Sequence, residues 1–142
     1  RITTIEGDKE IANIAKSLHK EYHFNNITVI NGSFKDKLPA ILQNIKTIDL
    51  VFIDGHHDGS YTLQYFNQIL AHCHDHTIIV FDDIYWSPDM TNAWQHIINN
   101  PKVTLALDIY RLGIVFLNND LSKQYFRYIP YLYKPWKIGL FG

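Results

Sequence analysis

The sequence lacks several features that would place the protein in a special class. Its single cysteine, Cys73, excludes an internal disulfide and suits a reducing compartment. No apolar run approaches the ~20 residues of a membrane-spanning helix, and no signal peptide is predicted. Basic and acidic residues nearly balance, at 13 and 14, so no basic surface is predicted for nucleic acid. We therefore expect a soluble, cytoplasmic domain without a nucleic-acid or membrane partner.

What the sequence contains is enough for one domain with a real core. It has 142 residues, of which 46% are hydrophobic. The chain opens on Arg1 and continues at once with the strand pattern 2-ITTIE-6. We therefore expect it to be part of a longer chain.

Strand and helix patterns alternate along most of the sequence. Apolar, β-branched runs predict strands over 2–6, 27–31, 48–54 and 77–83. Apolar residues at helical spacing predict helices near 8–18, 38–45, 60–71 and 88–99. Asp8 can cap the first of them, and Pro39 is expected in a first turn. The nearly continuous apolar run 48–54 predicts a strand that is buried on both faces, inside a parallel sheet.

After residue 102 the alternation stops. Two strands, 103–110 and 112–117, are separated by only a turn, so they are expected to pair as an antiparallel hairpin. The predicted fold class is α/β, a Rossmann-like, doubly wound, mostly parallel sheet with a C-terminal antiparallel hairpin strand. We expect the domain to span 1–119, followed by an aromatic tail, 120–142, that packs on the sheet or on a partner.

Polar side chains follow each of the four predicted parallel strands. In doubly wound sheets, ligands bind beyond the carboxyl ends of the strands, so these residues predict a binding or catalytic site at one edge. They are Glu6, then Asn31 to Ser33, then Asp54 to Asp58, then Asp82 and Asp83. Glu6 could accept hydrogen bonds from both hydroxyls of a ribose, or could only complement the dipole of the next helix.

The third strand ends on Asp54 and is followed by two histidines. His57 could act as a general base near neutral pH, and His56 could stack on a flat ring or bind a metal; a plain polar loop is the alternative. Asp82 and Asp83 could join Asp54 in an all-oxygen cluster that suits Mg²⁺, Ca²⁺ or Mn²⁺. In the other interpretation, one of these acids only caps the following segment.

A second group of potential metal ligands, 72-HCHDH-76, is interpreted as a solvated helix end. Contiguous residues do not converge easily on one ion. The segment also lies at the sheet edge opposite the acids. We therefore expect no zinc site there.

Two segments, 51-VFIDGHHDGSY-61 and 79-IVFDDIYWSPDM-90, followed by 107-LDIYRLGIVFL-117, resemble class I S-adenosylmethionine-dependent methyltransferases. The similarity is greatest to the small-molecule O-methyltransferase-like branch, which includes the catechol and caffeoyl-CoA O-methyltransferases. It extends from Ile2 to about Leu117. The resemblance implies an enzyme that transfers a methyl group from S-adenosylmethionine to a small-molecule acceptor, at an oxygen.

The resemblance also assigns site residues. Glu6 and Gly7 would bind the cofactor ribose, and the turn Asn31, Gly32, Ser33 and Phe34 would flank its adenine. Asp54 resembles a family metal ligand near the reacting centre and is also counted with the cofactor site. His56 takes the place of an adenine-stacking aromatic residue, and His57 that of a lysine that deprotonates the acceptor. Asp82 and Asp83 match an acid–amide pair that completes the metal site.

The family's first strand and its glycine-rich loop have no counterpart in the sequence. We therefore expect the C-terminal portion of a methyltransferase, inactive by itself. Without that strand, 2–6 and 48–54 would each have unpaired backbone groups along one side. The two strands are expected either to pair with one another or to be covered by a second copy, which favours a homo-oligomer.

Two other functions fit parts of the pattern. An acid after the first strand would also hold the ribose of NAD in an oxidoreductase fragment, although no G-x-G-x-x-G precedes it and the adjacent acids and the hairpin speak against it. Alternatively, the chain could be a non-catalytic interaction domain in which 125-YFRYIPYLYKPW-136 binds a partner. The acceptor substrate is not predicted.

Overall fold

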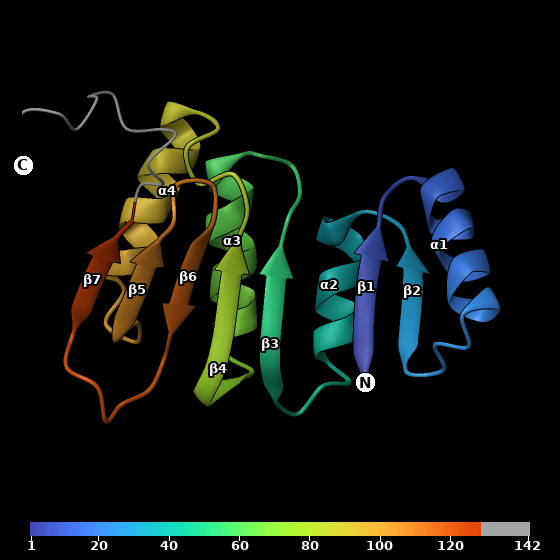
Figure 1. Cartoon of the computed structure of the whole chain (residues 1–142), viewed down its shortest axis with the longest axis horizontal. Coiled ribbons are helices and arrows are strands. Elements are labelled where there is room, and N and C mark those ends of the chain that lie inside the picture. Colours follow the sequence, from blue (N-terminus) through green and yellow to red (C-terminus); the bar gives the residue numbers. More distant parts are fainter. Residues whose placement is uncertain (129–142) are drawn as a thin grey trace, which may run out of the picture. The chain divides into compact units, whose positions relative to one another are not determined.

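Strands and helices alternate along the computed structural model, which describes residues 1–128 (Figure 1). The chain divides into two compact units, Arg1–Lys46 and Thr47–Gly142, and each is described by itself. The first contains β1 (Ile2–Glu6), α1 (Lys9–Glu21), β2 (Ile27–Asn31) and α2 (Phe34–Leu42). The second contains β3 (Ile48–Ile53), α3 (Gly59–Leu70), β4 (Cys73–Phe81), α4 (Pro88–Asn99), β5 (Leu105–Asp108), β6 (Gly113–Phe116) and β7 (Gln124–Arg127).

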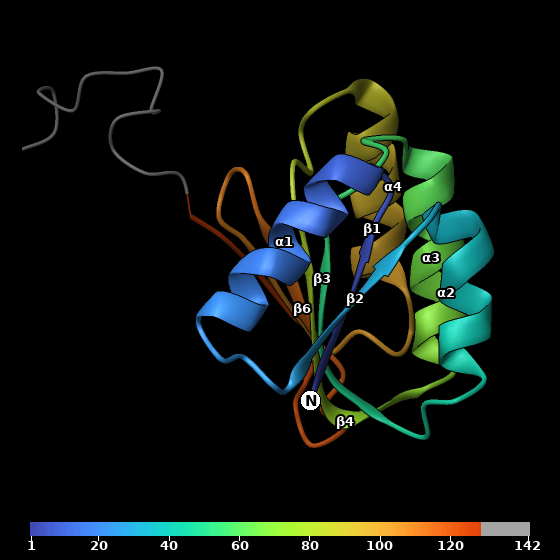
Figure 2. The ribbon, with the colours of Figure 1, turned by 90° about the vertical axis from the view of Figure 1, so that its right-hand side faces the viewer.

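The first unit is a two-stranded parallel sheet with one helix on each face (Figure 2). β1 and β2 pair in register, and the last pair is Glu6 opposite Asn31. Asp8 caps α1 as predicted, because its carboxylate accepts hydrogen bonds from two backbone amides of the first turn. Both strands therefore end at the same edge, directly before the helices that follow them.

The second helix of this unit begins earlier than the sequence indicates. Ser33 is its N-cap, and the Ser33 side chain accepts a hydrogen bond from the backbone N–H of Asp36. Pro39 was expected in the first turn, but it is the sixth residue of α2, where it removes one helical hydrogen bond. The strong cap at Ser33 explains why the helix starts before the apolar repeat.

The second unit contains a five-stranded sheet in the order β3-β4-β6-β5-β7. β3 and β4 are parallel, and β6 is antiparallel to both of its neighbours, which confirms the predicted hairpin and the mostly parallel sheet. β7 adds a parallel edge strand beside β5, inside the segment predicted to be a tail. Residues 129–142 of that predicted tail lie outside the described residues.

Two helices cover one face of this sheet. α3 and α4 lie side by side, and both views place them on the same face (Figures 1 and 2). The core between them and the sheet contains Phe66, Phe81 and Trp94, each about 1% exposed. Within residues 1–128, no helix has the length and apolar character that crossing a membrane requires.

The predicted central position and two-sided burial of the strand 48–54 are wrong, and one of the two alternatives for its pairing is not found. β3 lies at the edge of its sheet rather than inside it. Leu50 and Phe52 are 65% and 57% exposed, so β3 is not buried on both faces. β3 also does not pair with β1, which belongs to the other sheet. An apolar run alone does not reveal which neighbours a strand has, and this is why the prediction failed.

The segment 72-HCHDH-76 is also different from the prediction. β4 begins at Cys73, four residues earlier than expected, because Cys73 pairs with Ile48 and the Thr77 hydroxyl bonds the Ile48 carbonyl. Four of the five residues therefore belong to a strand and not to a helix end.

Candidate functional site

The predicted cofactor residues of the first unit meet at the carboxyl ends of β1 and β2. The Glu6 carbonyl accepts hydrogen bonds from the backbone N–H of Gly32 at 3.0 Å and from Asn31 Nδ2 at 2.9 Å. Asn31 Nδ2 also lies 3.2 Å from the carbonyl oxygen of Gly7. Gly32 has φ 145°, in the region that favours glycine. These bonds join the turns after the two strands into one rim, with Ser33 and Phe34 beginning α2 beside it.

The carboxylate of Glu6 is oriented by its own turn. Its Oε1 accepts a hydrogen bond from the backbone N–H of Asp8 at 2.8 Å. Within residues 1–128, no donor bonds the other carboxylate oxygen. A Cβ at Gly7 would meet no heavy atom within 4 Å, so the surface next to this carboxylate is open. An oriented carboxylate at an open rim suits a ligand with neighbouring hydroxyl groups, such as a ribose.

The remaining predicted residues lie in the loops that follow β3 and β4 in the second unit. Ile53 is the last residue of β3, and its carbonyl accepts a hydrogen bond from the N–H of Asp82 at 2.9 Å. Asp54 and Asp82 therefore follow their strands at the same level of the sheet. His57 Nδ1 lies 3.6 Å from Asp83 Oδ2, which is longer than a hydrogen bond, and the two groups form an ion pair only when the imidazole is protonated.

The backbone around these residues is strained. His56, His57, Asp83 and Tyr110 have φ of 64°, 42°, 49° and 77°, in the left-handed region. Non-glycine residues rarely adopt this region, and such strain persists only where the surrounding structure holds it. Four of the five such residues in the described chain lie in the loops at this edge of the second unit. Such strain is often found at functional sites, which makes these loops a candidate site.

The two histidines contact different neighbours. The His56 ring packs 5.0 Å from the Tyr61 ring, and its Nδ1 lies 3.4 Å from the Tyr65 hydroxyl. The His57 ring packs instead on Trp86, with ring centroids 5.1 Å apart. The two side chains therefore belong to separate parts of the site.

The loop that carries both histidines is fixed where α3 begins. Asp58 is the N-cap of α3, and hydrogen bonds from the Ser60 hydroxyl and the Tyr61 amide lower the pKa of Asp58. The next residue, Gly59, donates its N–H to Asp89 Oδ2 at 2.6 Å, at the start of α4. The starts of α3 and α4 thus hold this loop in place.

The three predicted metal ligands are not gathered around one point in the part of the chain that the structure describes. Asp83 Oδ1 lies 3.2 Å from Arg111 Nη2, so a guanidinium already occupies this carboxylate and would repel a divalent cation. Asp82 Oδ1 accepts a hydrogen bond from the N–H of Asp83. Residues 1–128 contain no group of three or more His, Cys, Asp or Glu that could hold an ion, so Asp54, Asp82 and Asp83 are not gathered.

Sequence reasoning missed three residues of this region. Arg111 binds Asp83, Trp86 packs on His57, and Asp89 binds the N–H of Gly59. Arg111 could have been found from its place in the predicted hairpin turn. β5 runs in the same direction as β4, so the turn after β5 lies at the same edge of the sheet as Asp83. Trp86 and Asp89 had no local signal, because their partners are about 30 residues away in the sequence.

Comparisons with known proteins identify the family and the fold of the chain. Residues 1–84 match the model of a protein family described as a methyltransferase domain. The chain is similar to the O-methyltransferase from Bacillus cereus in complex with SAH, with TM-score 0.67 and 23% identity over 82% of this chain and 62% of that one. It is also similar to an SAH-bound methyltransferase from Podospora anserina, with TM-score 0.67 and 16% identity over 84% and 61% of the two chains.

The chain thus spans about 61% to 62% of the length of these structures. At this level of identity, the similarity shows the Rossmann-like fold. No curated protein matches the sequence. All the predicted site residues, from Glu6 to Asp83, lie within the range matched by the family. The chain belongs to the methyltransferase domain family.

Proposed function

We propose that the protein binds S-adenosylmethionine and transfers its methyl group to an oxygen of a small-molecule acceptor. One observation carries the proposal: the polar strand ends of both units lie within residues 1–84, the range that matches the methyltransferase domain. The similar structures from B. cereus and P. anserina are bound to SAH, the product that remains after methyl transfer. Because this chain spans less than two thirds of those structures, the proposal concerns the protein at its natural full length.

The residues of the first unit fit the nucleoside half of this cofactor. The Glu6 carboxylate is oriented by the Asp8 amide and lies beside an open surface, where it could accept hydrogen bonds from two ribose hydroxyls. Ser33 and Phe34 follow β2 on the same rim and would lie near the base. In the second unit, Asp54 and His56 are proposed as further cofactor-binding residues.

His57 is proposed to take the proton of the acceptor. When bound, S-adenosylmethionine supplies a methyl group on a positively charged sulfur. His57 would take the hydroxyl proton that the acceptor gives up as its oxygen receives the methyl group and SAH is released. Because Nδ1 of His57 faces Asp83, Nε2 is the nitrogen available to the acceptor, and the Asp83 carboxylate would stabilise the resulting imidazolium. The Trp86 ring restricts the orientation of the imidazole.

A divalent cation such as Mg²⁺, Ca²⁺ or Mn²⁺ is not part of this proposal. Asp83 binds Arg111, and the described residues offer no group of three ligands. The predicted role of Asp54 as a metal ligand near the reacting centre therefore has no support from the geometry. The chemistry is assigned instead to positioning and to proton transfer.

Three further expectations remain proposals. β1 and β3 each pair with one strand only within residues 1–128, and a second copy that covers these edges would make a homo-oligomer. The cytoplasmic location is supported by the composition alone. The inactivity of the 142-residue chain by itself is also a prediction.

The proposal is tested with the full-length protein and S-adenosylmethionine that carries a labelled methyl group. A panel of small molecules with hydroxyl, amine or thiol groups serves as acceptors, and mass spectrometry locates the label. We expect a labelled methyl ether and SAH as products. Label on nitrogen or sulfur only, or no transfer with any acceptor, would contradict the proposal. Loss of activity in a chelator and its recovery with Mg²⁺ would show that a metal is required after all.

A further inference from the structure

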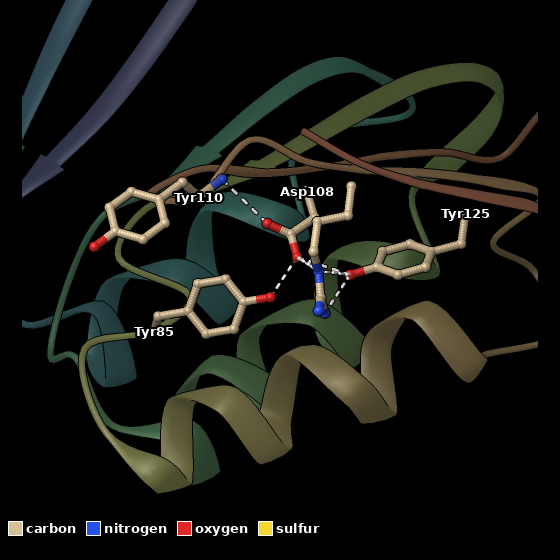
Figure 3. Close-up of polar contacts among 5 residues, drawn as sticks. Tyr85, Asp108, Tyr110 and Tyr125 are labelled. Carbon is tan, nitrogen blue, oxygen red and sulfur yellow. Dashed lines mark hydrogen bonds and ion pairs between the residues drawn. The ribbon is translucent and has the colours of Figure 1, made fainter. Parts of the chain in front are cut away.

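A buried carboxylate at the end of β5 has no role in the steps described above. The side chain of Asp108 is fully buried, with 0% of its surface exposed. Its Oδ2 accepts hydrogen bonds from the Tyr85 hydroxyl, from the Tyr125 hydroxyl at 2.7 Å and from Arg127 Nε at 2.8 Å. Its Oδ1 accepts the backbone N–H of Tyr110 at 3.1 Å (Figure 3). A carboxylate buried in this way is tolerated only because these donors replace its hydration.

The donors come from three separate segments of the second unit. Tyr85 belongs to the loop between β4 and α4, Tyr110 to the turn between β5 and β6, and Tyr125 and Arg127 to the edge strand β7. Burial and the neighbouring carboxylate raise the pKa of Tyr85, which agrees with its role as a donor. A single carboxylate therefore ties these segments together.

The loop that Tyr85 fixes is the one that carries the predicted site residues. Tyr85 comes two residues after Asp83 and directly before Trp86, and both of these neighbours contact His57. The Asp83 backbone is left-handed and has to be held by its surroundings. Of the side chains in this loop, Tyr85 makes the hydrogen bond to the most deeply buried partner, since Asp108 is 1% exposed.

A second connection runs from the same hairpin turn to the same loop. The Arg111 carbonyl accepts the N–H of Ile84 at 3.2 Å, and the Arg111 guanidinium binds Asp83. The turn between β5 and β6 therefore holds the loop at Asp83 and at Ile84. The Asp108–Tyr85 bond fixes the part of the loop next to Trp86.

We infer that Tyr85, through its hydrogen bond to Asp108, is a positioning residue that sets where Asp83 and Trp86 hold the His57 ring. The inference rests on the proposed function, because it assigns His57 to proton transfer. Tyr85 touches neither cofactor nor acceptor in this account. A displacement of the base by about 1 Å is enough to lower a rate by roughly 10²-fold. Loss of the Tyr85 hydroxyl can therefore lower kcat if it lets the His57 ring move.

The chain offers a matched control for this inference. Tyr85→Phe and Tyr125→Phe each remove one hydroxyl that donates to the same oxygen of Asp108. Only Tyr85 lies in the loop beside His57, since Tyr125 lies on β7. A purely structural role of the cluster predicts similar effects of the two variants, whereas the positioning role predicts a difference between them.

The experiment compares both variants with the wild type in the full-length protein. We expect Tyr85→Phe to lower kcat about 10-fold to 100-fold, with little change in the KM for S-adenosylmethionine, and Tyr125→Phe to keep kcat within about twofold. Amide hydrogen exchange supplies a readout that needs no activity. The N–H groups of Ile84 and Trp86, bonded to the carbonyls of Arg111 and Asp83, should exchange faster in Tyr85→Phe than in Tyr125→Phe.

The outcomes separate this inference from the proposed function. Equal kcat values in the two variants of an active enzyme, or equal exchange of the Ile84 and Trp86 amides, would overturn the positioning role. A wild-type protein that transfers no methyl group would contradict the proposed function. In that case the exchange comparison still decides whether Tyr85 holds the loop.

Discussion

Replacing Gly59 by alanine should destabilise the second unit and disturb the histidine loop. Gly59 is the first residue of α3 and donates its N–H to Asp89 Oδ2 at 2.6 Å. A Cβ at this position would lie 2.4 Å from the backbone oxygen of Asp89 and 2.8 Å from its backbone carbon. Real Cβ atoms do not approach so closely, and a backbone carbonyl at the start of α4 has little freedom to move. The two helix starts must therefore separate.

The expected change in the free energy of unfolding combines two destabilising effects and one stabilising effect. Forcing an extra methyl group into a packed contact costs about 1–3 kcal/mol. The Gly59–Asp89 hydrogen bond has a charged acceptor, and its complete loss would cost a further 1.5–3 kcal/mol, roughly. Lengthening the bond costs a part of this. Alanine is favoured over glycine in a helix by about 1 kcal/mol, and this gain is the smallest of the three. We expect a net loss of about 1–4 kcal/mol in the free energy of unfolding.

Urea unfolding followed by circular dichroism measures this loss, and Gly7→Ala is the control. A Cβ at Gly7 meets nothing within 4 Å, so that variant should be within about 0.5 kcal/mol of the wild type. The double variant Gly59→Ala with Asp89→Ala should not recover stability, because the nearest obstacle is backbone. A Gly59→Ala protein as stable as the wild type would refute this account of the contact between α3 and α4.

Three further predictions concern the same unit. Gly113→Ala should cost about 1–3 kcal/mol of unfolding free energy in a urea titration, since its Cβ would lie 2.6 Å from the buried Trp94 ring; an unchanged midpoint would contradict this. Burial raises the pKa of Asp108, but its hydrogen bonds lower it by more, to below the ordinary value. Its stabilisation is therefore present above a pH of about 4 and lost as the pH falls further, so unfolding free energies between pH 6 and 3 should decrease more steeply in the wild type than in Asp108→Asn. Finally, His57→Ala should lower turnover of the full-length enzyme by about 10²–10⁴, and a loss below tenfold would mean that another group activates the acceptor.

The sequence predicted those parts of the fold that depend on local patterns. Within residues 1–128, the alternation of β-branched runs with helical repeats located the four helices and the first four strands, and the two strands of the hairpin were recognised from its short turn. Asp8 was recognised as a helix cap because its role depends on the next few residues only. Local chemistry was sufficient in these places.

The failures depend on contacts between distant segments. β7 contains only four residues, all exposed, and it is a strand because it pairs with β5. The edge position of β3 depends likewise on which strands lie beside it. The long β4 depends on the pairing of Cys73 with Ile48. No periodicity within these segments could have shown these partners.

The candidate site was predicted in part. The rule that ligands bind beyond the strand ends predicted that Glu6 and Asn31 lie together at one edge of the first sheet. It likewise predicted that Asp54 and Asp82 lie together at one edge of the second sheet. The grouping of three acids around a metal was not found, because Arg111, 28 residues from Asp83, binds that carboxylate. The Asp108 cluster gave no sequence signal, because its donors come from three separate segments.

The rim at the ends of β1 and β2 is proposed to bind the ribose of S-adenosylmethionine through Glu6. Titration calorimetry of the full-length protein with S-adenosylmethionine tests it most directly, for the wild type and for Glu6→Ala. We predict binding by the wild type, and a loss of about 1.5–3 kcal/mol of binding free energy in Glu6→Ala, the magnitude of hydrogen bonds to a charged acceptor. Equal affinities of the two proteins would remove Glu6 from the site, and a wild type that binds no S-adenosylmethionine would contradict the account as a whole.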